Sequence, residues 1–412
     1  MNLFLKEKIM QTSVIGFPRI GTLRELKFAS EKYFRNEISA QQLLDTAENL
    51  RKIHWTTQQS AGIDYIPCND FSFYDIFLDT AALFNIIPKR YKELQLPELD
   101  TYFAMARGYQ GESGDVKALA MKKWFNTNYH YIVAEVEDDT DIQLVGEKPW
   151  NEYNEAKALG ILTKPVIIGP YTLMKHCRYT GEKKLADFVD AVVSAYQDFV
   201  KKCEELEIAW VQFDEPALVQ DMTADDIALF HRLYDELLPA AKTSKILLQT
   251  YFGDVRNIYP DLIKMDFAGI GLDFIEGKQT LSLIETCGFP KKKLLFAGLV
   301  NGKNIWKNHY EKTLKVLKAL QEKENSVVLS TSCSLLHVPY TLKHEDKLSQ
   351  TVISYFAFAE EKLEELHELS ILADVADYSS HAAYQNNQKL FAQPRDCYND
   401  AVKDRLAHVT EA

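Results

Sequence analysis

The amino-acid sequence predicts an α/β fold, a closed (β/α)8 barrel of the TIM type. Eight short apolar runs rich in valine, isoleucine and phenylalanine are spread along the 412 residues. Such runs are typical of strands buried on both faces in a parallel sheet, and helix-patterned stretches separate most of them. Nearly every run ends in a polar residue or a glycine, and the loops after the strands carry the chemistry of such a barrel. The runs begin near Thr12, Ile63, Pro165, Trp210, Ile246, Phe267, Leu294 and Ser326.

Two helix-patterned stretches, 23–37 and 39–61, follow the first strand, and Ser39 is a plausible N-cap of the second. About a hundred residues then separate the second strand from the third, far more than one crossover helix requires. This insertion, about 71–164, begins with a helical stretch over 73–84. Because it follows the C-terminal end of a strand, we expect it to lie over or beside the barrel mouth.

From the third strand onward, strands and helices alternate regularly. We expect the barrel to occupy residues 1–375 and to end in one long amphipathic helix over 351–374. Residues 376–412 are polar and predict a linker with one short helical segment, leading toward a further domain that we expect this chain to lack. The helices expected between the later strands cover 184–207, 224–241, 280–288 and 309–323.

The composition excludes several classes of function. The 59 acidic and 47 basic residues give a net charge of −12, which argues against non-specific binding of nucleic acid. No apolar run approaches the roughly 18 residues of a membrane-spanning helix, and the opening MNLFLKEKIM lacks the pattern of a signal peptide. The six cysteines are far apart and form no CxxC pair, which favours free thiols in a reducing compartment, the cytoplasm.

Three cations stand close together after the first strand, in FPRIGTLRELK (17–27). Arg24 and Lys27 are i and i+3 on the opening turn of a helix, so they share one face. Cations near a helix N-terminus oppose the helix dipole unless an anion joins them, so these two residues and Arg19 could form an anion site. The alternative is a solvated helix start with Glu25 as an ion-pair partner.

A ten-residue stretch of the insertion mixes aromatic, amide and cationic side chains. KKWFNTNYHY (122–131) holds two lysines, four aromatic residues, two asparagines and a histidine. This combination could hold a planar heterocycle with an anionic tail. A half-buried strand or hairpin gives much the same pattern and is the alternative.

Two further strand exits carry candidate chemistry. In VQFDEPAL, Asp214 and Glu215 could serve acid–base catalysis, metal binding or recognition of an amine. Because neighbouring strand residues point to opposite faces, only one can face inward, and the alternative for the pair is a cap on the next helix. In STSCSLLHVP, Cys333 and His337 could form a nucleophilic pair or bind a metal, although their apolar neighbours favour a buried structural role.

Eight motifs occur along the chain in a fixed order: GFPRIG with RELK, AGIDYIPCNDFSFYD, YFAMARG, KWFNTNYHYIV, KPVIIGP, WVQFDEPAL, FAGLVNGKNIW and SCSLLHVP. In this order they resemble the N-terminal half of cobalamin-independent methionine synthases. The resemblance runs from about Thr12 to Leu372, and residues beyond it resemble the linker between the two barrels of that family.

The resemblance implies a two-barrel methyltransferase of methionine biosynthesis, which moves a methyl group from 5-methyltetrahydrofolate polyglutamate to homocysteine. In that family the C-terminal barrel carries the catalytic zinc, and the N-terminal barrel contributes to binding of the folate and its polyglutamate tail. Carried over residue by residue, the folate-binding residues would be Arg24, Glu25, Leu26, Lys27 and Lys123. The expected partners are therefore this folate and a C-terminal catalytic barrel.

The zinc ligands of the family have no full counterpart in this chain. If the two barrels are compared as a duplication, the corresponding positions are Tyr251, Gly253, Asp273 and Cys333, and only the last two keep a carboxylate or a thiol. We therefore expect no metal, no cofactor and no catalytic residue here, with zinc confined to the C-terminal barrel.

Two other hypotheses stay open at this point. The chain could be a free-standing folate-binding module that partners a separately encoded catalytic barrel. It could also be an independent barrel enzyme that uses Asp214, Glu215 and Asp273, in which case it would turn over substrate without any partner.

Overall fold

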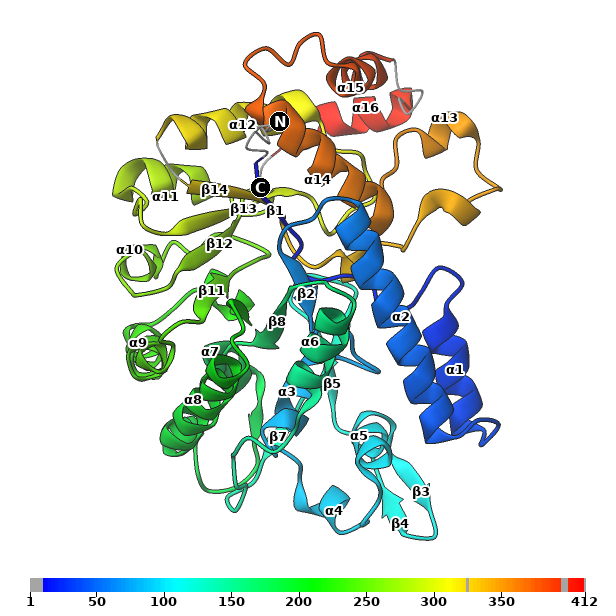
Figure 1. Cartoon of the computed structure of the whole chain (residues 1–412), viewed down its shortest axis with the longest axis vertical. Helices are drawn as coiled ribbons and strands as arrows, with labels where there is room; N and C mark the ends of the chain where they lie inside the picture. Colours follow the sequence, from blue (N-terminus) through cyan, green and yellow to red (C-terminus); the bar gives the residue numbers. More distant parts are fainter. Residues whose placement is uncertain (1–9, 324–325, 394–398, 411–412) are drawn as a thin grey trace, which may run out of the picture.

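Eight parallel strands form the barrel that the sequence predicts (Figure 1). The computed structural model describes residues 10–323, 326–393 and 399–410. Hydrogen-bonded neighbours follow the order β1-β14-β13-β12-β11-β10-β8-β2, and a parallel bridge between Ser13 and Tyr65 joins the two ends of this sheet. The strands are β1 (Thr12–Ser13), β2 (Ile66–Cys68), β8 (Thr163–Ile168), β10 (Trp210–Asp214), β11 (Lys245–Gln249), β12 (Gly269–Asp273), β13 (Leu294–Val300) and β14 (Ser326–Thr331).

The apolar runs locate these strands because the barrel buries both of their faces. Every residue of β2, β8 and β12 is buried. A strand boundary differs from the predicted one where a side chain bonds to the backbone in place of strand pairing. β2 begins at Ile66 and not near Ile63, because the preceding turn is held by Asp64, whose Oδ2 accepts the Thr12 N–H at 2.8 Å.

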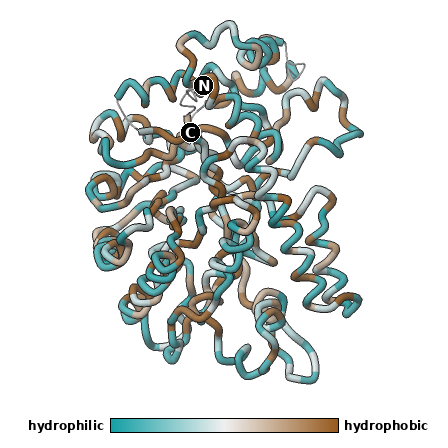
Figure 2. The backbone as a smooth tube through the Cα atoms, viewed as in Figure 1, coloured by the Kyte–Doolittle hydropathy of each residue, from teal (hydrophilic) through white to brown (hydrophobic). Residues whose placement is uncertain are grey.

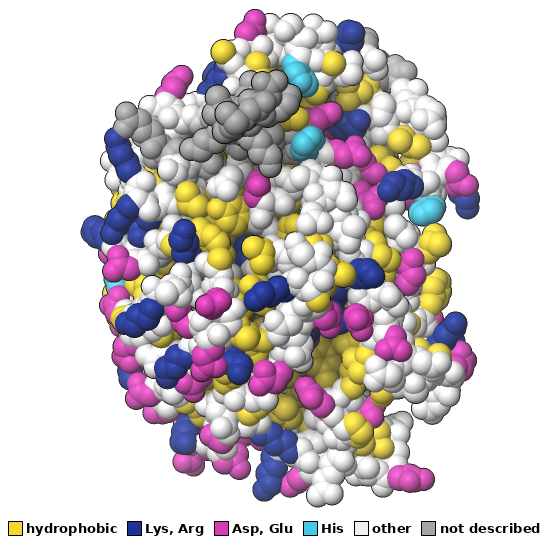
Figure 3. Space-filling view, viewed as in Figure 1, with side chains coloured by type: hydrophobic (Ala, Val, Ile, Leu, Met, Phe, Trp, Pro, Cys, Tyr) yellow, Lys and Arg dark blue, Asp and Glu magenta, His cyan; other side chains and the backbone are white. Residues whose placement is uncertain are grey.

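Helices form the outer layer, and hydrophilic residues are frequent along them (Figure 2). The predicted N-cap is confirmed: Ser39 Oγ accepts the Gln42 N–H, and the Gln42 side chain accepts the Ser39 N–H in return. On the face shown in Figure 3, cationic and anionic side chains are interspersed. The helices of this layer are α1 (Glu25–Phe34), α2 (Ala40–Ser60), α6 (Lys148–Ala158), α7 (Pro170–His176), α8 (Val189–Glu205), α9 (Ala224–Leu237), α10 (Tyr259–Leu262), α11 (Thr280–Cys287) and α12 (Tyr310–Glu322).

The segment between β2 and β8 contains helices and short antiparallel hairpins. The predicted helical stretch over 73–84 begins at Ile76, because Asp75 caps it. KKWFNTNYHY forms a hairpin of β5 and β6, as the alternative interpretation of this stretch proposed. The elements before α6 are α3 (Ile76–Leu83), α4 (Lys89–Lys92), α5 (Glu98–Arg107), β3 (Tyr109–Gly111), β4 (Gly114–Val116), β5 (Met121–Lys123), β6 (His130–Ile132) and β7 (Glu135–Val136), which pairs with β9 (Arg178–Tyr179).

The single helix predicted over 351–374 is wrong, because the structure breaks it in two. A turn separates α13 (Gln350–Ile353) from α14 (Ala359–Asp374). Phe356 pairs with Trp306 in an isolated antiparallel bridge, and the Ala357 N–H donates to the Ile305 carbonyl at 2.8 Å. These contacts with a distant loop use backbone groups that a continuous helix would need for itself.

The C-terminal segment contains two helices, where the sequence predicted one. α15 (Ala382–Ala392) packs on α12, and the Asn387 side chain accepts from the Tyr310 N–H at 3.0 Å and donates to the Asn308 carbonyl at 2.8 Å. α16 (Asp400–Ala407) follows and is exposed. Among the described residues, no helix is long and apolar enough to cross a membrane. The described cysteines are free thiols, and Cys397 lies outside the described residues.

Candidate functional site at the barrel mouth

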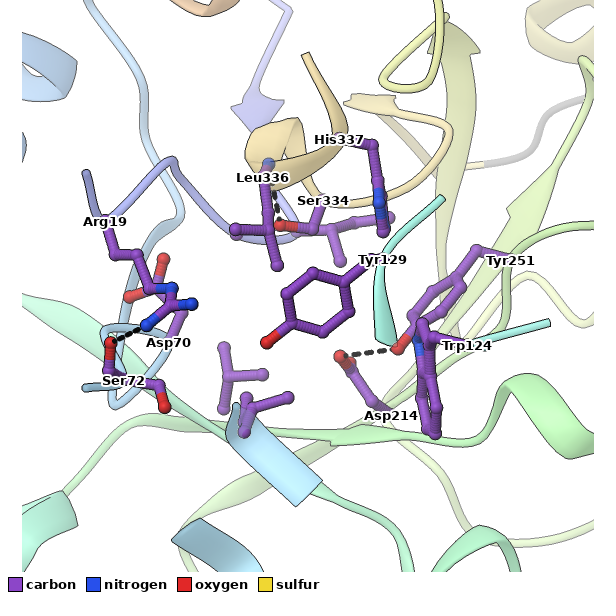
Figure 4. A pocket seen from close by; sticks show the side chains of 14 residues that line it. Arg19, Asp70, Ser72, Trp124, Tyr129, Asp214, Tyr251, Ser334, Leu336 and His337 are labelled. Carbon is purple, nitrogen blue, oxygen red and sulfur yellow. Dashed lines mark hydrogen bonds between the residues drawn. The ribbon is translucent and has the colours of Figure 1, made fainter. Parts of the chain in front are cut away.

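The C-terminal ends of the strands converge on a small cavity, lined by both polar and apolar side chains, that the insertion covers (Figure 4). Its volume is about 30 Å³, which is room for about one water molecule, whereas small-molecule sites measure roughly 300–1,000 Å³. Trp124 and Tyr129 of the insertion line this cavity together with residues at the strand ends, so the insertion lies over the mouth, as expected. The side chains labelled around the cavity are Arg19, Asp70, Ser72, Trp124, Tyr129, Asp214, Tyr251, Ser334, Leu336 and His337.

Aromatic side chains fill the mouth above this cavity. Phe125, in the loop between β5 and β6, meets Phe252 with ring centroids 5.7 Å apart, and Phe252 meets His337 at 5.4 Å. Both phenylalanines adopt left-handed backbone conformations, with φ of 48° and 75°. Such conformations cost about 1–3 kcal/mol each and persist only where the surrounding structure imposes them. Burial lowers the pKa of His337 to about 4, so this imidazole is neutral at physiological pH and serves packing.

The two adjacent carboxylates at the exit of β10 have separate roles. Asp214 faces the cavity, where its carboxylate accepts from Tyr251 Oη at 3.1 Å and from Gln212 Nε2 at 2.7 Å. Glu215 is fully buried on the other side and accepts the N–H groups of Tyr171 at 3.0 Å and Thr172 at 2.7 Å. The prediction that only one of the pair faces inward is confirmed. The predicted cap on the next helix is wrong, because Glu215 accepts N–H groups at the start of α7, a helix that precedes β10 in the chain.

A buried lysine that the sequence interpretation overlooked lies beneath Asp214. Lys164 Nζ donates to the Val14 carbonyl at 2.9 Å and to the Gln212 side chain. Burial lowers the pKa of Lys164 and raises the pKa of Asp214, while their mutual attraction opposes both shifts. In the sequence, the lysine directly precedes the apolar run that begins at Pro165, at the end of the insertion. Its partner, Gln212, is on the neighbouring strand, so only the strand order identifies the pair.

The predicted folate-binding residues on α1 divide into exposed cations and structural residues. Arg24 is exposed at the N-cap, and Lys27 is exposed with an ion pair to Glu31 at 3.8 Å. The Glu25 carboxylate accepts the Leu23 N–H at 3.0 Å and therefore holds the preceding turn. Leu26 is 2% exposed and packs in the core. Only Arg24 and Lys27 of this group present cationic side chains to solvent.

Lys123 is exposed on β5, where it pairs with His130 across the hairpin. The next residue, Trp124, is buried and lines the cavity. None of the predicted folate-binding residues lines the cavity itself. The exposed cations lie outside the filled mouth, on two different elements, α1 and β5.

Comparison with known proteins accounts for the ordered motifs of the sequence. Residues 11–325 match the sequence model of the family described as cobalamin-independent synthase, N-terminal domain. The chain belongs to the cobalamin-independent methionine synthase family. It is 52% identical over 397 residues to the 5-methyltetrahydropteroyltriglutamate–homocysteine methyltransferase of Campylobacter jejuni subsp. doylei, covering 96% of this chain and 52% of that protein. The protein of the same name from Streptococcus thermophilus is 52% identical over 403 residues, covering 98% and 53%. The chain thus spans about half the length of the curated relatives it matches.

Solved structures support the same fold. A B12-independent methionine synthase from Shewanella sp. W3-18-1, in complex with selenomethionine, superposes with a TM-score of 0.59 at 15% identity, covering 88% of this chain and 97% of that one. A putative vitamin-B12-independent methionine synthase from Listeria monocytogenes gives a TM-score of 0.57 at 15% identity, covering 89% and 96%. At this identity the likeness concerns the barrel fold.

The four positions that the duplication comparison would pair with zinc ligands have side chains that do not suit zinc. The Asp273 carboxylate accepts the N–H groups of Phe252, Ile275 and Glu276 at 2.7 to 3.0 Å, so both its oxygens are engaged. Cys333 is buried and supplies the one thiol among these four positions. Tyr251 and Gly253 supply no imidazole or thiol. Among the described residues, no three His, Cys, Asp or Glu side chains gather as a metal site.

Proposed function

We propose that this chain is the folate-side half of a zinc-dependent methyltransferase that makes methionine from homocysteine and 5-methyltetrahydrofolate polyglutamate. The curated relatives bear the name of that reaction and are about twice as long. In this proposal zinc and the catalytic residues belong to a C-terminal barrel, and this chain supplies a binding surface in the cytoplasm. The free thiols of the described cysteines support that location.

The observation that carries the proposal is the contrast between a filled mouth and exposed cations. The cavity of about 30 Å³ leaves no room for a pterin or an amino acid. Arg24, Lys27 and Lys123, which stand at motif positions, keep their charges in solvent. Each glutamate of a folate tail adds one carboxylate, and Lys and Arg side chains bind such groups through charge-assisted hydrogen bonds.

The proposal is tested by assembling the two halves. This chain is assayed for methionine formation from homocysteine and 5-methyltetrahydropteroyltriglutamate, alone and fused to the remaining half of the Streptococcus thermophilus relative, with zinc supplied. We expect no turnover by either half alone and turnover by the fusion. Turnover by this chain alone would support the independent-enzyme hypothesis, and activity of the isolated other half equal to that of the fusion would refute the folate-side role. Activity of the two halves mixed but unfused would favour the separately encoded module.

A further inference from the structure

One buried carboxylate ties the hairpin that carries Lys123 to the barrel. Asp75 is 0% exposed. Its Oδ2 accepts the N–H of Ile132 on β6 at 2.9 Å, and its Oδ1 accepts the N–H groups of Phe77 and Leu78 at the start of α3, at 2.8 and 3.2 Å. The Asp75 side chain therefore caps α3 and also holds β6 of the hairpin in place.

The anchored bond lies close to Lys123 in the hairpin. Ile132 pairs with Met121, and the following pairs along the hairpin are Lys122 with Tyr131 and Lys123 with His130. Two residues of an antiparallel strand span about 7 Å. Among the described residues the Lys123 side chain has no hydrogen-bond or ion-pair partner, so the placement of its ammonium group depends on the hairpin backbone.

The hairpin needs such a tie because it is short. β5 and β6 have three residues each, and an isolated two-stranded hairpin is marginally stable at best in water. At the other end, the Asn126 side chain donates to the Glu276 carboxylate at 2.8 Å, which also accepts from Lys303 Nζ at 2.6 Å. The tip contact is exposed, whereas the Asp75 contact is buried and is the stronger constraint.

We propose that Asp75 is a positioning residue for recognition of the polyglutamate tail, because it fixes the hairpin that presents Lys123. This inference rests on the proposed function, since it assigns Asp75 a role through a cation that binds the tail. Asp75 touches no substrate. It acts by holding the β6 backbone, and with it the opposite strand, at a fixed place on the barrel wall.

Two substitutions separate the anchor from the helix cap. Asp75→Asn keeps one oxygen for the N-terminus of α3, where asparagine is a favoured cap, but it turns an amide donor toward the Ile132 N–H. Asp75→Ser also retains a capping hydroxyl and is too short to reach β6. A matched control is Asp138→Asn, because the Asp138 carboxylate likewise accepts two N–H groups from another segment, those of Glu182 and Lys183.

The first test uses hydrogen exchange on this chain. We expect peptides covering 121–132 to exchange about ten- to a hundredfold faster in Asp75→Asn, the factor for leaving a buried N–H donor without an acceptor. Peptides covering β10 should keep their protection, and Asp138→Asn should leave the hairpin unchanged. Unchanged hairpin exchange in a folded variant, or equal loss over the whole barrel, would overturn the proposal. If Asp75→Asn does not fold, Asp75→Ser decides by the same criteria.

The second test measures tail discrimination in the fused enzyme, as kcat/KM for the triglutamate substrate divided by that for the monoglutamate. Asp75→Asn should lower this ratio, and it should lower it no further once Lys123→Ala is present. If Lys123→Ala lowers the ratio and Asp75→Asn does not, the inference fails while the proposed function stands. If Lys123→Ala leaves the ratio unchanged, the tail-binding role proposed for Lys123 fails, and with it the role of Asp75 in tail recognition. Hydrogen exchange then reports only on the anchor.

Discussion

Burial, more than any charged neighbour, sets the protonation of the carboxylates in this barrel. Desolvation raises the pKa of Glu215 to about 7, although two backbone N–H groups and the Tyr234 hydroxyl donate to it. Desolvation likewise raises the pKa of Asp70 and of Asp273 to about 6. These groups hold turns and helix ends in place, and their charge opposes burial in the folded protein.

The stability of the chain should therefore fall as these carboxylates ionise. Because the pKa of Glu215 is raised from 4.5 to about 7 in the folded state, its contribution to stability is fully present below pH 4.5 and is lost as pH rises toward 7, by about 3 kcal/mol at most. Glu215→Gln removes this dependence and also relieves the like-charge repulsion that raises the pKa of Asp214. Urea unfolding at about pH 5 and about pH 7.5 should show a larger fall for the wild type than for the variant. An equal fall in both proteins would contradict the assignment.

A second prediction at this scale concerns the four positions that the duplication comparison would pair with zinc ligands. Because Asp273 is engaged with backbone N–H groups and Tyr251 and Gly253 offer no imidazole or thiol, this chain should retain no zinc after dialysis. Elemental analysis of the dialysed protein checks this, with the fused enzyme as the positive control. About one tightly held zinc per chain would show that our view of these donors is wrong.

Residue roles could be predicted from the sequence where a local rule applies. The alternation of strand residues separated Asp214 from Glu215, and the apolar surroundings of His337 indicated a packed imidazole. Lys164 could not be recognised in this way. Its role depends on Gln212, which lies 48 positions away in the sequence and reaches it only once β8 and β10 pair.

At the scale of elements, the sequence located strands better than it located helix ends. A strand buried on both faces leaves a continuous apolar run, so each barrel strand was visible in isolation. The break between α13 and α14 was not, because the pairing of Phe356 with Trp306 belongs to the folded molecule. The second helix of the C-terminal segment was missed as well, since α15 has a polar sequence and docks through Asn387.

The capping box of α2 gives an element-scale prediction. Ser39→Ala removes the acceptor for the Gln42 N–H and should lower the free energy of unfolding by about 1 kcal/mol. Lys52→Ala, at an exposed site inside the same helix, is the matched control and should stay within about 0.5 kcal/mol of the wild type. Urea denaturation measures both. Equal losses in the two variants would mean that the cap does not stabilise the helix.

At the scale of the whole molecule, the insertion changes what the barrel can do. Trp124 and Phe125 occupy the mouth where barrel enzymes bind their substrates, and the cationic side chains proposed for the folate tail lie outside it. The same segment that fills the mouth also presents Lys123 on its exposed strand. Under the proposed function, the exposed cations outside the mouth are the binding surface of this chain.

The most direct test of this account compares mono- and triglutamate substrates in the fused enzyme carrying Arg24→Ala or Lys123→Ala. We predict that kcat/KM for the triglutamate falls about tenfold, as expected for losing a charge-assisted contact at an exposed site, while the monoglutamate value changes little and the difference shrinks at high salt. Lys122→Ala, whose side chain points to the opposite face of β5, should leave the ratio unchanged. Equal losses with both substrates, or no loss with either, would contradict the claim that these cations bind the tail.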